Sequence, residues 1–209
     1  MRKGKVLSLK NFSFARFISR NNILSLFVVL IVAGVAVGIF TESKLKVLSN
    51  YSALYLERFI SLRSGESFLS IALSSFMGSA LVLLILFAAG TSILGVIFVP
   101  FLAVFRGVFY GGISALLYSE YAVKGIAFNA VLIIPSAFVF VIALLLASRE
   151  SMRFSILIAK ISLPGSASVN LSFDFKNYCG RYLFIVLIAL ASALTDAVLS
   201  CSFLDSLML

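Results

Sequence analysis

Histidine is absent from this chain of 209 residues, and carboxylates are scarce, with eight Asp and Glu against 17 Lys and Arg. Histidine is the commonest general base and metal ligand near neutral pH, so its absence argues against a zinc enzyme or a serine–histidine hydrolase. The sequence also has no Walker A loop, no GxSxG turn and no HExxH helix. Intramembrane proteolysis by aspartates needs a pair of them, whereas Asp196 stands alone in the apolar runs. We therefore predict a protein without catalytic residues, metal or cofactor.

Charged residues make up only 12% of the chain, whereas hydrophobic residues make up 62% and the mean hydropathy is +1.15. A soluble domain carries about a quarter charged residues, so this composition excludes a soluble protein. The net charge of +9 does not indicate nucleic-acid binding, because the basic residues are spread over segments beside apolar runs. The composition predicts a membrane protein whose first partner is the lipid bilayer.

Cysteine is also rare, and the two thiols are poorly placed for a disulfide. Cys179 precedes the last apolar run and Cys201 lies near its far end. A helix of that length separates them by most of a bilayer, far beyond the distance that a disulfide spans. We predict two unpaired thiols.

Five apolar runs are long enough to cross a bilayer, whose hydrocarbon core needs about 20 residues of helix. They cover residues 23–40, 68–89, 92–118, 125–147 and 182–203. We therefore predict an all-α polytopic membrane protein with five transmembrane helices. The first four form one membrane region, 23–147. The fifth belongs to a last region, 182–209, that ends in a short segment outside the cell.

The segments between these runs are polar or amphipathic. Residues 1–22 carry six Lys and Arg and no acid, which predicts a basic cytoplasmic N-terminus before an uncleaved first helix. Residues 41–67 are predicted to lie outside, and YSALYLERFISL within them has the spacing of an amphipathic helix on the bilayer surface. Residues 148–181 form a predicted cytoplasmic loop with a surface helix at SMRFSILIAKI and a turn at Pro164–Gly165.

The distribution of basic residues supports this topology. With the N-terminus in the cytoplasm, the inner segments hold eleven Lys and Arg and the outer segments hold five. Cytoplasmic segments of multi-pass proteins carry an excess of positive charge. We therefore predict an N-terminus inside and a C-terminus outside.

Two charged residues lie deep within the predicted spans, Arg106 in the third and Asp196 in the fifth. An ionisable residue at membrane depth is a candidate functional site, because burying an arginine centrally costs about 2.5–3.5 kcal/mol. Each lies at a similar distance from the cytoplasmic end of its span, so the two could form an ion pair. Alternatively, the long side chain of Arg106 could reach a headgroup region.

The third run also contains residues that interrupt helices, which favour a second arrangement. Pro100 precedes Arg106, and Gly107, Gly111 and Gly112 follow it. The run could therefore consist of two half-helices that meet near Arg106, where protein or a water-filled cavity satisfies the freed backbone groups. In that case Arg106 would line a transport path. Otherwise it would serve structural pairing, partner binding or assembly.

Three further features concern contacts between helices. Asn129 in the fourth run could donate hydrogen bonds to a neighbouring helix, and Pro135 frees a backbone carbonyl that needs another partner. Small-xxx-small pairs, which allow two helices to approach closely, occur at Gly34 and Gly38 and again in the third run. These pairs could pack within one subunit or between subunits. Both a monomer and a homo-oligomer are therefore compatible with the sequence.

The third and fourth runs share a pattern of glycines, prolines and one basic residue. The third run has a glycine and a proline, then a basic residue with spaced glycines: Gly95, Pro100, Arg106, Gly107 and Gly111. The fourth has a glycine near its start and a central proline, Gly125 and Pro135. In this pattern and in the order of its segments, the chain resembles the stage II sporulation protein M family, most sharply over residues 94–147. Many members carry an amide or a histidine after the central proline, where this chain has Ser136 and Ala137, so a diverged relative is the alternative to the sporulation protein itself.

The resemblance implies a non-enzymatic scaffold in the cytoplasmic membrane of an endospore-forming bacterium. Members of the family assemble with two cell-wall hydrolases, stage II sporulation proteins D and P, and localise them for septal peptidoglycan remodelling during engulfment. Segment 41–67 and the faces of the spans would then be docking surfaces. The alternative is the membrane subunit of a small transporter or permease, with a polar path lined by Arg106, Asn129 and Asp196.

Overall fold

The structure is a computed structural model that describes residues 22–42, 44, 46–161, 171–204 and 206. These residues form helices and connecting turns, and no β-strand occurs among them. The prediction of an all-α protein is confirmed. Most of the predicted cytoplasmic N-terminus, the turn at Pro164–Gly165 and the last three residues of the chain lie outside the described part.

Helices follow one another with short connections along the described chain. They are α2 (Asn22–Glu42), α3 (Lys46–Ser61), α4 (Phe68–Gly90), α5 (Gly95–Phe128), the π-helical turn η1 (Asn129–Ile133), α6 (Ile134–Ile161) and α7 (Leu171–Phe203). The predicted amphipathic helix within 41–67 is α3. α4 starts after Ser67, whose side-chain oxygen accepts a hydrogen bond from the backbone N–H of Ser70, as is usual at a helix N-terminus.

Four helical segments are long and apolar enough to cross a membrane: Ile23–Glu42, Phe68–Gly90, Gly95–Ile161 and Phe173–Phe203. Large apolar side chains stay exposed on them, including Phe40, Leu69 and Ile97, as expected of surfaces that face lipid. Both features indicate a multi-pass membrane protein. The third segment combines α5, η1 and α6, so the predicted total of five spans depends on counting this segment twice.

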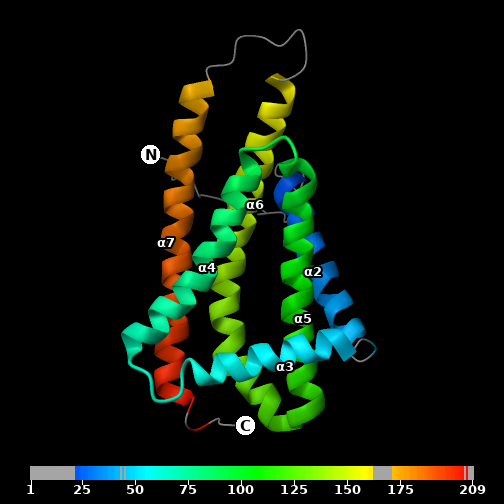
Figure 1. The fold of residues 1–209 in the computed structure, drawn as a ribbon, viewed down its shortest axis with the longest axis vertical. Coiled ribbons are helices and arrows are strands. Elements are labelled where there is room, and N and C mark those ends of the chain that lie inside the picture. Colours follow the sequence, from blue (N-terminus) through cyan, green and yellow to red (C-terminus); the bar gives the residue numbers. More distant parts are fainter. Residues whose placement is uncertain (1–21, 43, 45, 162–170, 205, 207–209) are drawn as a thin grey trace, which may run out of the picture.

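The long helices form an elongated bundle (Figure 1). α2 packs mainly along α5, while α4, α6 and α7 pack on one another. α3 lies across the bundle near one end, which also holds the connection from α5 to α6 and the end of α7. The opposite end holds the turn between α4 and α5, the end of α6 and the start of α7. The described parts of the predicted outer segments and of the predicted inner segments 90–91 and 148–181 therefore lie at opposite ends of the bundle (Figure 1).

The third predicted segment is not broken near Arg106, so the half-helix arrangement is wrong. α5 continues through Pro100 and Arg106, and within it the backbone departs from helical geometry at Ala122, with φ 46° and ψ −123°. The chain reverses there, inside the predicted outer loop 119–124, and α6 returns alongside α5 (Figure 1). Pro100 removes one backbone hydrogen bond near the start of α5, which the rest of this long helix tolerates.

The stretch 151–161, predicted as a helix on the membrane surface, is instead the last part of α6. Ser151 donates to the carbonyl oxygen of Leu86 at 2.9 Å and hydrogen-bonds the hydroxyl group of Tyr182 at 2.7 Å. Ser155 donates to the carbonyl oxygen of Ser92 at 2.7 Å. These contacts hold polar side chains inside the bundle, so the helix continues instead of turning onto the bilayer surface.

The small-residue pairs meet each other within one chain, between α2 and α5. A Cβ atom added to Gly34 would lie 3.1 Å from the Cα of Gly107 and would collide with the carbonyl oxygen of Val104. The two backbones run too close for a side chain, which is why glycine is required at this contact. The glycines at this contact are Gly34 and Gly38 of α2 and Gly107, Gly111 and Gly112 of α5.

Candidate functional site

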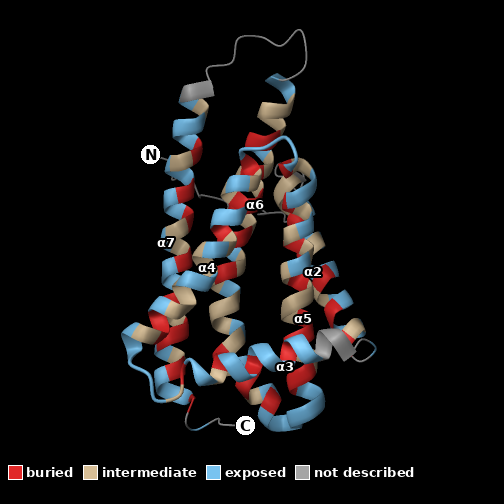
Figure 2. Ribbon diagram, viewed as in Figure 1, coloured by how far each residue is buried: buried red, intermediate tan, exposed pale blue. Residues whose placement is uncertain are grey.

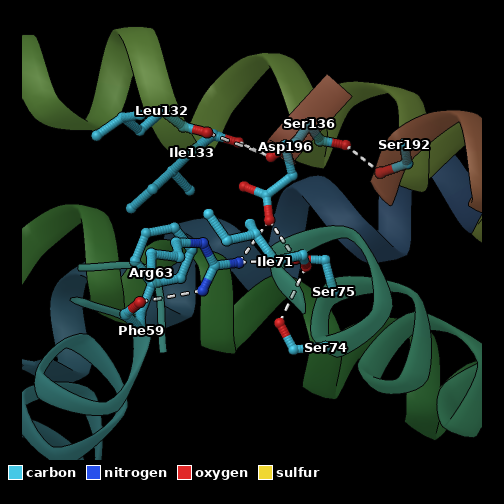
Figure 3. A network of polar contacts seen from close by, with 10 residues as sticks. All are labelled: Phe59, Arg63, Ile71, Ser74, Ser75, Leu132, Ile133, Ser136, Ser192 and Asp196. Carbon is cyan, nitrogen blue, oxygen red and sulfur yellow. Dashed lines mark hydrogen bonds and ion pairs between the residues drawn. The ribbon is translucent and has the colours of Figure 1, made fainter. Parts of the chain in front are cut away.

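A buried ion pair joins the end of α3 to α7 (Figure 3). Nη2 of Arg63 lies 2.5 Å from Oδ2 of Asp196, and the two side chains are only 8% and 6% exposed. Ser75 of α4 bridges the pair, because its hydroxyl group accepts a hydrogen bond from Arg63 at 2.8 Å and donates one to the same oxygen of Asp196. The end of α3 and the neighbouring helix α4 are thus tied at one carboxylate oxygen to α7, which lies far along the sequence.

The register of α3 brings Arg63 to this position. Ser52, Leu56, Phe59 and Arg63 are buried, with spacings of four, three and four residues that place them on one helical face. Nη1 of Arg63 donates to the carbonyl oxygen of Phe59 at 3.1 Å, and its guanidinium carbon lies 3.5 Å from the centroid of the Phe59 ring. From the sequence, Arg63 was predicted only to lie in the outer segment 41–67. The helical spacing from Ser52 to Arg63 was the signal that could have identified it.

Asp196 lies on the small-residue face of α7. Small side chains allow α4 to approach α7 closely, which brings Ser75 to the carboxylate. Oδ1 of Asp196 is buried and has no hydrogen-bond partner among the described residues. The buried small residues of this face are Ala189, Ser192, Ala193, Ala197 and Ser200.

Arg106 does not pair with Asp196, so the ion-pair alternative is wrong. The carboxylate is already bound by the segment that follows α3. Instead, the guanidinium carbon of Arg106 lies 5.2–5.4 Å from the ring centroids of Phe109, Tyr110 and Phe140. Each such cation–π contact contributes about 0.5–2 kcal/mol, but none cancels the charge. Nε of Arg106 is buried, and it has no hydrogen-bond partner among the residues that the structure describes.

Both charged sites border one cavity of about 260 Å³, whose wall is formed by residues of α3, α4, α5, α6 and α7. Arginine side chains and one carboxylate share its wall with hydroxyl groups from α4, α6 and α7. The ionisable side chains in the wall of the cavity include Arg58, Arg63, Arg106 and Asp196. Arg106 and Asp196 were both predicted from the sequence as polar sites. The structure places them at the same cavity, but they do not form an ion pair with each other.

Asn129 is fully buried at the start of η1 and does not border this cavity. Its side-chain nitrogen donates to Oγ of Ser114 at 3.0 Å and to the hydroxyl oxygen of Tyr118 at 2.8 Å, both on α5. These bonds hold together the two sides of the reversal at Ala122. Asn129 therefore links η1 to α5 by hydrogen bonds. It does not belong to the cavity that Arg106 borders.

Pro135 lies directly after η1, at the second position of α6. The hydroxyl group of Ser136 donates to the carbonyl oxygen of Leu132 at 3.3 Å and to that of Ile133 at 3.1 Å. A side chain therefore supplies hydrogen bonds where the proline and the wide π-helical turn loosen the backbone pattern.

Candidate metal ligands do not cluster in the described part of the chain. No group of three or more His, Cys, Asp or Glu there could hold a metal ion. Cys179 and Cys201 are both free. The site is a cavity lined by charged side chains and hydroxyl groups.

Comparison with known proteins assigns this fold to a family. The family described as Stage II sporulation protein M matches residues 8–200. The chain belongs to the stage II sporulation protein M family. This is not known as a family of enzymes. No curated protein and no solved structure matches the chain.

Membership in the stage II sporulation protein M family makes this chain a sporulation-related membrane protein. The match spans α2 to α6 and α7 as far as Ser200. Arg63, Arg106 and Asp196 all lie within it. The cavity and its ion pair are thus part of the region that defines the family, and not of an added segment.

In this family member, Asn129→Ala is expected to lower the free energy of unfolding by about 1–2 kcal/mol, because two buried hydrogen bonds to α5 are lost. The measurement is the midpoint of unfolding in sodium dodecyl sulfate, followed by circular dichroism. Asn50→Ala is the matched control, since Asn50 is exposed on α3 and should change the stability by less than about 0.5 kcal/mol. Equal losses of stability in both variants would contradict a stabilising role for the hydrogen bonds of Asn129.

Proposed function

We propose that this chain is a non-enzymatic scaffold of the bacterial cytoplasmic membrane. It recruits and localises cell-wall hydrolases for septal peptidoglycan remodelling during sporulation engulfment. The observation that carries the proposal is the match of the stage II sporulation protein M family over residues 8–200. The expected partners are stage II sporulation proteins D and P, which would cut the peptidoglycan outside the membrane.

The exposed face of α3 is the surface that we propose for docking (Figure 2). Tyr51 and Leu54 are exposed large side chains on the side of α3 that points away from the buried face. Exposed aromatic and aliphatic side chains among the polar residues of a surface helix form the kind of patch that is typical of an interaction site. α3 also lies across the end of the bundle where the predicted outer segments gather (Figure 1).

The buried ion pair supports this role because it sets the position of α3. Arg63 follows the last turn of α3 and is held by Asp196 of α7 and Ser75 of α4. The docking face is therefore presented on a rigid element, which lowers the entropy lost on binding a partner. In the proposed scaffold, Asp196 acts through the position of α3 and does not touch the partner.

Recovery of cell-wall hydrolases with the tagged full-length protein tests the proposal. The protein is purified in mild detergent from its endospore-forming host during starvation, and the co-purifying proteins are identified by mass spectrometry. We expect the wild type to recover the hydrolases. The double variant Tyr51→Ala and Leu54→Ala should recover about tenfold less, because aromatic and aliphatic anchors contribute most of the affinity of such an interface.

Leu183→Ala is the matched control, since Leu183 is 68% exposed on α7 and lies outside the docking face. Its recovery of hydrolases should equal that of the wild type. Absence of hydrolases from the wild-type sample would contradict the scaffold. Recovery of an ATPase or other transport subunits in their place would favour the transporter alternative, for which the cavity beside Arg106 is the supporting observation.

A further inference from the structure

We propose that the cavity beside Arg106 binds a phosphate group, either that of an anionic lipid headgroup or a free phosphate ion. This ligand site goes beyond the scaffold role, which requires no ligand, and it stands or fails independently of hydrolase recruitment. The inference rests on the charge of the cavity, its unused hydrogen-bond donors, its opening and its size.

The cavity carries an excess of positive charge. Three arginines line it, Arg58, Arg63 and Arg106, against the single carboxylate of Asp196. Asp196 is engaged by Arg63, and among the described residues no carboxylate forms an ion pair with Arg106. The ring centroid of Tyr110 lies 5.3 Å from the guanidinium carbon of Arg106, but a phenol hydroxyl group carries no charge near neutral pH. An unbalanced cation inside a helix bundle is unfavourable, and an anion bound from outside the chain would remove that cost.

Residues that line the cavity also have unused hydrogen-bond donors. The Nε–H groups of Arg63 and Arg106 are both buried without an acceptor in the described part of the chain. Ser79 lines the cavity, and its hydroxyl group makes no hydrogen bond with the described residues. Phosphate oxygens accept several hydrogen bonds at once, and guanidinium groups match their geometry better than other cations do.

The opening and the size of the cavity suit a small anionic group. Gly78 of α4 borders the cavity, and a Cβ atom added there would meet no atom within 4 Å, so the wall is open at this residue. The volume of about 260 Å³ is just below the range of about 300–1,000 Å³ that drug-sized ligands occupy. One phosphate group with a few neighbouring atoms fits this space. Basic pockets between transmembrane helices bind phosphate headgroups in this way.

Titration of the full-length protein in neutral detergent tests the site. The lipid probe is phosphatidylglycerol, compared with phosphatidylcholine, and lipids that stay bound are counted by native mass spectrometry. The ion probe is sodium phosphate, compared with sodium chloride at equal ionic strength, and the readout is the unfolding temperature. Selective retention of phosphatidylglycerol identifies a lipid headgroup as the ligand. A rise in unfolding temperature with sodium phosphate alone identifies the free ion. No response to either probe overturns the proposal.

Three variants then locate the binding site. Arg106→Gln should weaken binding of the responding probe by about tenfold or more, because a charge-assisted contact with phosphate is lost. Ser79→Ala should weaken it by about threefold, since one neutral hydrogen bond is lost. Lys124→Gln is the matched control, because it removes the same charge at an exposed position outside the cavity and should leave binding unchanged.

Equal weakening by Lys124→Gln and Arg106→Gln overturns the proposal, because the probe would then respond to the net charge of the protein. Ser79→Ala keeps every hydrogen bond between the described residues, so it is expected to fold like the wild type. If Arg106→Gln fails to fold, unchanged affinity in Ser79→Ala overturns the site.

Discussion

Asp196→Ala is expected to lower the free energy of unfolding by about 3–5 kcal/mol, the cost of removing one partner of a buried ion pair. Arg63 would stay buried, with 8% of its side chain exposed, and would have no carboxylate beside it. The hydroxyl group of Ser75 would also lose its acceptor. The loss is measured as the midpoint of unfolding in sodium dodecyl sulfate. Circular dichroism is the suitable signal, because the chain has no tryptophan.

Two comparisons show whether the effect comes from the ion pair. Glu57→Ala removes an exposed carboxylate from α3 and should change the stability by less than about 0.5 kcal/mol. Arg63→Met combined with Asp196→Leu should recover most of the stability, because two apolar side chains of similar volume need no partner. If Asp196→Ala were as stable as Glu57→Ala, the ion pair would not hold α3 in place.

Gly107→Val is expected to cost about 3 kcal/mol or more, at the upper end of the usual cost of overpacking. The Cβ atom alone would lie 3.1 Å from the Cα of Gly34 and would collide with the carbonyl oxygen of Ile31. Both belong to the backbone of α2, so the collision is relieved only if α2 moves away from α5. Because α2 packs mainly on α5, we expect less protein in the membrane and an earlier unfolding midpoint.

Gly180→Val is the matched control for this substitution. A Cβ atom at Gly180 of α7 would meet no atom within 4 Å, so the same change of residue type creates no collision. Its stability should stay within about 0.5 kcal/mol of the wild type, because valine and glycine differ little in helix propensity. Similar accumulation and unfolding of the two variants would argue against the close contact between α2 and α5.

The lengths of the apolar runs predicted the shorter helices well, because a bilayer requires every residue of a span to be helical. α2 and α4 begin and end within two residues of the predicted runs 23–40 and 68–89. α7 was predicted less well, since it begins at Leu171 and not at residue 182. Its polar first turns are helical because Tyr178 is buried against the bundle and Arg181 forms an ion pair with Glu150 at 2.6 Å.

The pairing of charges could not be predicted from depth in the spans. Arg106 and Asp196 were recognised as charges at membrane depth, and their depths allowed a bond between them without requiring one. The actual partner of Asp196 is Arg63, from a segment predicted to lie outside the spans. Span length says nothing about how a connecting segment packs, whereas the helical register of α3 directs Arg63 into the bundle.

The amino-acid sequence by itself determined that this is an all-helical membrane protein with close helix contacts at glycine pairs, and it indicated the family. These properties follow from composition and from spacing over a few turns of helix. Only the tertiary structure decided that Arg63 meets Asp196, that the glycines of α2 face those of α5, and that three arginines border one cavity. Arg63 and Asp196 lie 133 positions apart, and the packing of α3, α4 and α7 alone brings them together.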